Sequence, residues 1–212
     1  MKLQAFALVG AVFALAALTG CETMSAEECA TADWRQLGYS DADRNGADNL
    51  ANRADSCAEK GISADVQAYH RGFEDGMRAF CQPPRGFDFA RRGGTFNGSC
   101  PGDLDEDFRY AYGDGRRVYD LQQSINAAQS AVDTAIRRRN ELDDDIRGQE
   151  GLLQAATTDA ERNRIRGVIE GMRRERRDVN DDLRVAQEQV PRLNYQMNVL
   201  RSELGGRWGA SW

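Results

Sequence analysis

The sequence predicts an all-α protein, in which a small disulfide-stapled helical domain is followed by a long antiparallel coiled-coil helical hairpin. Three observations predict this class. Aliphatic residues recur at alternating steps of three and four from Val118 onward, and four cysteines lie between residues 29 and 100. Near Asp103 a Gly- and aromatic-rich region gives way to Arg, Asp, Glu, Gln and spaced aliphatics. We therefore expect four segments, at residues 1–20, 21–103, 104–204 and 205–212.

Composition narrows the function classes. The chain has 212 residues, 41% hydrophobic and 29% charged, which is typical of a folded chain. Its 34 acidic residues outnumber the 28 basic ones, and the formal net charge is -6. An acidic chain lacks the positive field that attracts nucleic acid, so we expect no nucleic-acid partner.

Residues 1–20 have the pattern of a lipoprotein signal peptide. Lys2 precedes a small and apolar run to Leu18, which has the length of a signal-peptide core and is short for a membrane span. The run ends in Leu18-Thr19-Gly20-Cys21, which resembles a bacterial lipobox. The resemblance implies lipidation of the Cys21 thiol, acylation such as palmitate at the new amino terminus, and a mature chain that begins at Cys21. An ordinary Sec cleavage site beside a cysteine is the alternative.

The expected location is the bacterial outer membrane, with the protein lipid-anchored at Cys21 and facing the periplasm. Glu22 follows the lipidation site, whereas lipoproteins that stay in the inner membrane typically have Asp there. Each buried methylene of an acyl chain contributes about 0.8 kcal/mol, so two or three chains make a stable anchor. The membrane is therefore an expected partner.

The remaining cysteines, Cys29, Cys57, Cys81 and Cys100, are expected to form two disulfides in an oxidising compartment. Three pairings are possible. We favour Cys29 with Cys57 and Cys81 with Cys100, because each pair closes a loop of tens of residues with Pro and Gly between or after its ends. A zinc site is the alternative, but the cysteines lack a C-x-x-C spacing.

Within residues 21–103, residues 63–80 are predicted to be helical. An apolar stripe lies beside a stripe of small residues, which would let another backbone approach closely: Ala68, Gly72, Gly76 and Ala79. Aromatic residues also precede Gly38 and Gly113, so we expect three helices to pack together. Residues 82–101 are predicted to be a Pro- and Gly-rich loop with a short hairpin through Thr95 and Phe96.

Residues from about 21 to 120 resemble an uncharacterised family of bacterial lipoproteins, known as domain of unknown function 2799. The residues that carry the resemblance are Cys29, Asp33, Trp34, Gly38, Asp41, Cys57, Tyr69, Gly72, Gly76, Phe80, Cys81, Gly86, Gly94, Phe96, Gly98, Cys100 and Pro101. The chain departs from the family at Ala42, where Gly is usual, and in its coiled-coil tail. The resemblance implies a lipoprotein and no established activity, so it transfers no catalytic residue.

Residues 104–204 are predicted to form the hairpin, with its turn near residues 157–159. A capping-box pattern from Thr158 to Glu161 begins the second helix, and Pro191 is expected to kink it without ending it. Facing positions should have numbers that sum to about 317. Charge blocks then match across the hairpin: Asp143 and Asp144 oppose Arg174 and Arg173, and Arg137 and Arg138 oppose Asp182 and Asp181. An arm of about 40 residues would project roughly 60 Å.

One stretch of the sequence resembles a metal site. Asp41, Asp43 and Asn45 followed by Gly46 reproduce the first half of an EF-hand loop, which makes them a calcium candidate. The twelfth position is Asn52 rather than Glu, and helix-cap and turn chemistry accounts for the same residues. We therefore expect no metal and no cofactor.

The sequence also gives no set of catalytic residues. His70 is the only histidine and has no nucleophile motif beside it, so no enzyme is expected. Trp208 and Trp212 lie in the Gly-rich tail at residues 205–212. They are expected to fold back on the disulfide region, although an exposed handle for a partner, a glycan or a lipid interface is the alternative.

These observations predict a non-enzymatic structural or protein-interaction module of the cell envelope. The hairpin would act as an adaptor or spacer that contacts an envelope protein partner. The alternative is a lipoprotein that binds calcium or a cell-wall glycan through the region from Cys29 to Cys100.

Overall fold

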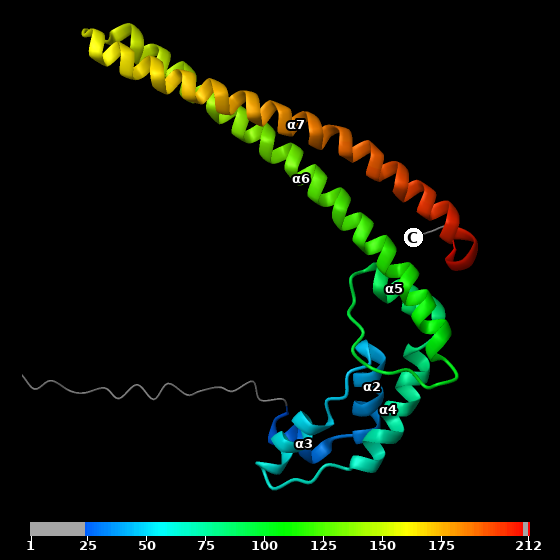
Figure 1. Ribbon diagram of the computed structural model, residues 1–212. Helices are drawn as coiled ribbons and strands as arrows, with labels where there is room; N and C mark the ends of the chain where they lie inside the picture. The colour runs from blue at the N-terminus through cyan, green and yellow to red at the C-terminus, as the bar shows by residue number, and fades with distance from the viewer. Residues whose placement is uncertain (1–23, 210–211) are drawn as a thin grey trace, which may run out of the picture.

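A computed structural model describes residues 24–209 and residue 212 of the chain (Figure 1). Its elements in this part are all helices, which confirms the predicted fold class: α1 Ala26–Thr31, α2 Trp34–Asn45, α3 Leu50–Ala58, α4 Val66–Phe80, α5 Pro83–Arg91, α6 Asp105–Ala155 and α7 Asp159–Trp208. The predicted signal peptide at residues 1–20 and the predicted lipidation site at Cys21 lie outside the described residues.

Glycine allows α2 and α4 to touch along their backbones. A Cβ atom added at Gly72 of α4 would lie 1.8 Å from the carbonyl oxygen of Arg35 in α2. A Cβ at Gly38 of α2 would lie 2.1 Å from the carbonyl oxygen of Tyr69 in α4. Only a residue without a side chain fits at either position. The stripe of small residues is therefore a packing surface, as predicted.

Two disulfides hold the domain together in the favoured pairing. Cys29 of α1 is bonded to Cys57 of α3, with their Cα atoms 5.5 Å apart. Cys81, the C-cap of α4, is bonded to Cys100 in the segment before α6, with Cα atoms 5.8 Å apart. All four side chains belong to hydrophobic clusters of the domain. Each disulfide therefore joins two segments that also contact each other through apolar side chains.

The segment at residues 82–101 differs from the predicted loop. Its first half is helix α5, with Pro83 and Pro84 in the first turn and Phe87 and Ala90 buried. Proline is tolerated in a first helical turn because the N–H that it lacks would have no intrahelical partner. The expected short hairpin does not form: Thr95 and Phe96 lie outside regular structure, and the Phe96 ring packs on Phe80 and Phe108.

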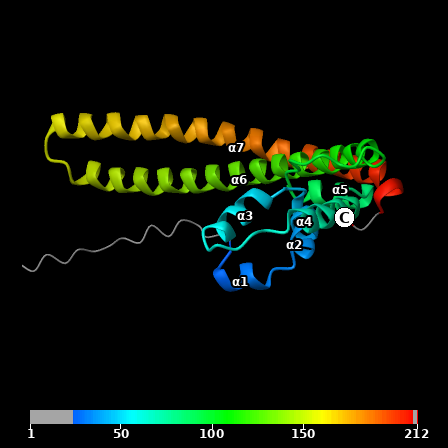
Figure 2. The same cartoon turned by 90° about the horizontal axis from the view of Figure 1, so that it is seen from below.

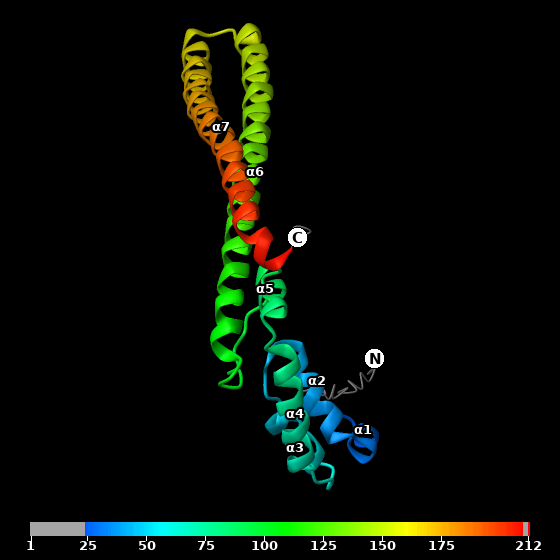
Figure 3. The same cartoon turned by 90° about the vertical axis from the view of Figure 1, so that its right-hand side faces the viewer.

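The hairpin consists of α6, with 51 residues, and α7, with 50 residues. The connection lies at residues 156–158, beside the predicted turn, and the Thr158 side chain accepts a hydrogen bond from the Glu161 N–H as the N-cap of α7. Figures 2 and 3 show the two helices side by side, joined at the tip. The tip lies far from α1 and α3 (Figure 1). Pro191 lies inside α7, which continues through it as expected.

The hairpin and the disulfide domain share a core at their junction. Phe108 of α6 lies in one cluster with Phe80, Cys81 and Cys100, although it follows the predicted domain boundary at residue 103. A Cβ at Gly115 of α6 would lie 2.3 Å from the carbonyl oxygen of Phe87, so α6 also touches the backbone of α5. The start of α6 is thus fixed to the domain by packing.

Candidate functional site

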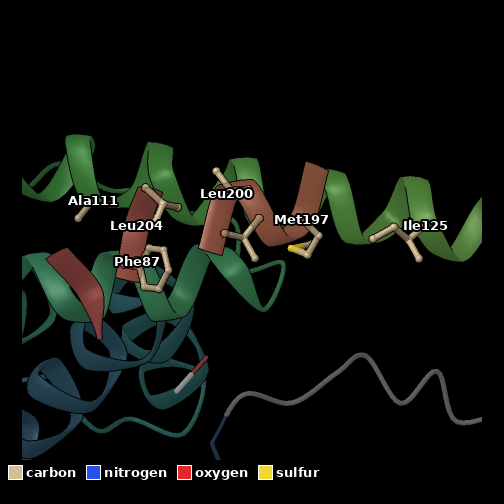
Figure 4. Packing of buried hydrophobic residues seen from close by; sticks show 7 residues of the cluster. Phe87, Ala111, Ile125, Met197, Leu200 and Leu204 are labelled. Atoms are coloured by element: carbon tan, nitrogen blue, oxygen red, sulfur yellow. The ribbon is translucent and has the colours of Figure 1, made fainter. Parts of the chain in front are cut away.

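The end of α7 returns to the disulfide domain. Leu200 and Leu204 of α7 are buried in one cluster with Phe87 of α5 and with Ala111 and Ile125 of α6 (Figure 4). Helix α7 continues to Trp208, past the predicted start of the tail at residue 205. Both helices of the hairpin are therefore attached to the domain.

The two tail tryptophans pack on this junction. The Trp208 ring stacks on Phe87 with ring centres 5.5 Å apart, and Trp212 meets the same ring edge-on at 5.2 Å. Each ring is only partly exposed. These contacts agree with the prediction that the tail folds back on the disulfide region.

A set of polar residues, which we call the base network, closes the junction: Asp114, Arg117, Glu203, Arg207 and Trp208. The Asp114 carboxylate is 5% exposed and accepts a hydrogen bond from Trp208 Nε1 over 3.0 Å. It also lies 3.2 Å from Arg117 and 3.1 Å from Arg207. Because it is buried, the carboxylate needs these partners.

Arg117 joins the base network to α7. Its two terminal nitrogens donate to the two carboxylate oxygens of Glu203 over 2.8 and 2.9 Å. This fork-to-fork geometry fixes orientation as well as charge. Hydrogen bonding to Arg117 lowers the pKa of Glu203 and correspondingly raises the pKa of Arg117. No local sequence pattern indicates this network, because its bonded members on α6 and α7 are 86 to 94 residues apart.

Ion pairs farther along the hairpin differ from the predicted ones. Arg138 binds Glu175 rather than Asp181, and Arg173 binds Glu150 rather than Asp144. Asp143 binds Arg176 rather than Arg174, while Asp144 pairs within its own helix with Arg147. Long arginine side chains reach acids up to about a turn and a half from the directly facing position. The antiparallel direction was predicted correctly, but the individual partners were not.

The hairpin has two different faces on either side of its seam. In the heptad repeat, the residues of the pairs Arg117–Glu203 and Arg138–Glu175 flank the apolar seam on one side of the hairpin. We call this side the groove face. The pairs Asp143–Arg176 and Glu150–Arg173 lie on the other side, which we call the polar face. Each of these four ion pairs therefore lies on one side of the seam between the helices.

Two adjoining hollows lie on the groove face near the domain. The first, of about 380 Å³, is lined by Leu121, Val199 and Leu200 among others. The second, of about 570 Å³, is lined by alanines of α6 and by Leu193 of α7. Gln196 borders both, so the hollows form one groove between α6 and α7. Small and aliphatic side chains predominate in its floor, which makes it suited to apolar contacts.

A buried polar network lies in the disulfide domain. The Asp41 carboxylate is 1% exposed and accepts two hydrogen bonds of 2.7 Å from Arg53. The Tyr69 hydroxyl donates to the same carboxylate over 2.9 Å and accepts from the Asn49 N–H over 3.0 Å. From its sequence spacing, Asp41 was a candidate calcium ligand, and no sequence pattern pointed to Arg53 as its partner. All the named groups bind each other, which identifies a structural network.

This network shifts two pKa values. Burial raises the pKa of Asp41, but hydrogen bonds from Arg53 and Tyr69 outweigh burial and hold the pKa below its ordinary value of 3.8. Burial raises the pKa of Tyr69 well above its ordinary value of 10.0. Asp41 is therefore charged and Tyr69 neutral at neutral pH.

The calcium candidate does not have the geometry of an EF-hand loop. Asp41, Asp43 and Asn45 lie in the last turns of α2, where residues two apart point to different sides. Asp41 is bound by Arg53, and Asp43 is bound by Arg85 over 2.6 Å. The Asn45 side chain accepts from the Ala47 N–H. Among the described residues, no His, Cys, Asp and Glu group is placed to hold a metal ion. These contacts do not support the calcium alternative for Asp41, Asp43 and Asn45.

Comparison with known proteins identifies the domain. The family model described as "Protein of unknown function (DUF2799)" matches residues 33–117. This stretch of the chain matches the family that the resemblance named, and the match ends at residue 117, within α6. No curated protein and no solved structure matches the chain. In residues 24–209, none of the helices has the length and apolar character that crossing a membrane requires.

Proposed function

We propose that the chain is an outer-membrane-anchored periplasmic lipoprotein, which acts as a non-enzymatic adaptor or spacer of the bacterial cell envelope. The observation that carries the proposal is the attachment of both hairpin helices to one disulfide-stapled domain. Packing with α5 fixes the start of α6, and the base network fixes the end of α7. An arm whose two helices are both attached to the domain at its base is stiff enough to set a distance between two envelope components.

The chain near Cys21 supports a short tether. Met24 is 4% exposed, and its N–H and carbonyl both bond with the Ser56 hydroxyl of α3, over 3.2 and 3.0 Å. Three residues span at most about 10 Å when extended. A lipid at Cys21 would therefore hold the α1–α3 end of the domain within about 10 Å of the membrane.

The arm extends beyond the domain. The part of α6 after Val118 projects roughly 55 Å at 1.5 Å per residue. Because the tip lies far from α1 and α3 (Figure 1), an anchor at Cys21 would leave the tip accessible to a partner in the periplasm. The buried polar groups of the domain bind one another, so the proposal assigns them a structural role and names no catalytic residue.

A shortened arm tests the proposal. Removal of residues 129–149 and 169–189 takes three heptads from each helix, which shortens the hairpin by about 30 Å while keeping the tip and the base network. We expect this variant to remain folded and anchored but to lose the partner that full-length protein retains in pull-downs from envelope fractions. Equal recovery of that partner by both proteins would contradict a spacer role.

A further inference from the structure

The exposed large apolar side chains of the hairpin gather on its groove face. Heptad positions place Leu152, Val168, Val185 and Val199 there, with exposures of 55%, 38%, 46% and 49%. Tyr195, which is 69% exposed, borders the first hollow of the same face. The corresponding positions of the polar face hold one apolar residue, Ile136, which is partly buried, and otherwise polar ones: Gln129, Asp143, Glu150, Arg173, Asn180 and Gln187. Apolar exposure on one side only is typical of a surface that another protein covers.

Small residues on the same side leave room for a close approach. Gly148 of α6 and Gly171 of α7 flank the groove face, and a Cβ added at Gly148 would meet nothing within 4 Å. At Gly171 it would meet only the Arg174 side chain at 3.9 Å. Glycine inside a helix costs about 1 kcal/mol relative to alanine. The two glycines leave space beside the groove face, as Gly151 and Gly167 do elsewhere on the hairpin.

The charge of the groove face indicates which kind of partner can bind there. Its central stretch carries five exposed acids, of which Arg138 pairs with two, Glu141 and Glu175, and leaves three without an opposite charge beside them on this face: Asp145, Asp178 and Asp182. A second copy laid along the whole face, in either direction, would bring two acidic stretches together, which is unfavourable. A partner with lysine or arginine at this level would be attracted instead.

We propose that the groove face binds an amphipathic α-helix of a partner protein. Apolar residues of that helix enter the groove beside Ala131 and Leu193 and meet Leu152 and Val168 near the tip, and its basic residues face the acidic stretch. The product is a three-helix coiled coil. This inference rests on the proposed adaptor function and names the face and the chemistry of the partner.

Synthetic helices test the chemistry of the site. Two 28-residue peptides share leucine at the heptad core positions and carry either lysine or glutamate at the flanking positions. We expect the full-length chain to bind the lysine peptide more than tenfold more tightly than the glutamate peptide, by fluorescence anisotropy at about 0.15 M salt. Equal affinities would overturn the inference.

Matched charge variants locate the binding. Asp145→Asn with Asp182→Asn removes two acids from the groove face, and Asp133→Asn with Glu170→Gln removes two from the polar face. The loss of two exposed ion pairs weakens binding roughly tenfold. We therefore expect the first variant to bind the lysine peptide about tenfold more weakly and the second variant less than twofold more weakly. Similar losses from both would mean that the peptide responds only to net charge, and would overturn the inference.

Photo-crosslinking in cells of the source organism separates this inference from the proposed function. A photo-reactive residue replaces Gln196 on the groove face or, as the control, Gln187 on the polar face. We expect an adduct with an amphipathic basic helix from position 196 alone. Adducts from position 187 alone, or with a second copy of the chain, would overturn the inference and leave the adaptor function standing. Absence of adducts from both positions would count against both.

Discussion

Trp208 Nε1 donates a hydrogen bond to Asp114 Oδ2 over 3.0 Å, joining residues that are 94 positions apart in the chain. The bond closes the hairpin at the end where its two helices meet the family domain. It explains why α7 continues through Gly205 and Gly206, which have low helix propensity: the final turn is held by tertiary contacts.

The base network should contribute measurably to stability. Asp114→Ala leaves the Trp208 N–H without its acceptor and removes one of the two carboxylate partners of Arg117 and of Arg207. We therefore expect a loss of about 2–3 kcal/mol in the free energy of unfolding. Trp208→Phe keeps an aromatic ring on Phe87 and should cost about 1 kcal/mol. Urea denaturation measures both. Asp120→Asn, at an exposed carboxylate of the same helix, serves as the control; an equal loss there would contradict the account.

The close approach of α2 and α4 gives the sharpest substitution test. Gly72→Ala would place a methyl group 1.8 Å from the Arg35 carbonyl oxygen, so the helices must separate. We expect a loss of about 3 kcal/mol or failure to fold. Gly113→Ala meets nothing within 4 Å and should stabilise the protein by about 0.5–1 kcal/mol. Thermal unfolding followed by circular dichroism distinguishes the two, and similar effects would refute the backbone contact.

Some elements of the fold could be predicted from the sequence, and others could not. The heptads predicted the hairpin because a 3.5-residue repeat is local and is maintained over many turns. The stripe at Gly72 and Gly76, with the similar pattern at Gly38, predicted the close packing of α4 with α2. Helix α5 was missed because Pro83 and Gly86 are typical of loops, and only their places in the first turn and at the α6 contact make them compatible with a helix.

The candidate site at the base of the hairpin was less predictable from the sequence, for a different reason. Its determinants join residues far apart in the chain, such as Arg117 with Glu203, and depend on which way long side chains turn. The ion-pair partners were therefore misassigned although the direction of the hairpin was correct. Asp41 was considered for calcium because sequence spacing does not show that Arg53 occupies its carboxylate.

Acid should destabilise the domain through Asp41. Its pKa is lowered in the folded protein, so the stabilisation is present above the unfolded pKa of about 3.9 and is lost as the pH falls through the folded value. We expect Asp41→Asn to cost about 3 kcal/mol at pH 7 and to flatten the loss of stability below pH of about 4. Denaturant midpoints from pH 7 to pH 2 measure this. An unchanged slope in the variant would show that other carboxylates control acid unfolding.

Lipidation at Cys21 remains a prediction and has a direct test. Cys21→Ser should abolish labelling by a fatty-acid probe and leave an uncleaved precursor. Glu22→Asp is the matched variant, because it should keep the label and retain the protein in the inner membrane. Palmitate incorporation that is unchanged in Cys21→Ser would end the anchor hypothesis, and an unchanged outer-membrane location of Glu22→Asp would remove the argument for that membrane.

A cysteine pair at positions 128 and 190 tests the projecting arm most directly. Ala128 is 5% exposed in the seam, and Val190 borders the hollow on the opposite side of the same level. In a chain whose own disulfides are already formed, we predict that Ala128→Cys with Val190→Cys crosslinks within one molecule and leaves a monomer on non-reducing gels. A parallel pair of chains would instead place each residue opposite its own copy. A covalent dimer from Ala128→Cys alone, with no intramolecular product from the pair, would contradict the arm and the adaptor function built on it.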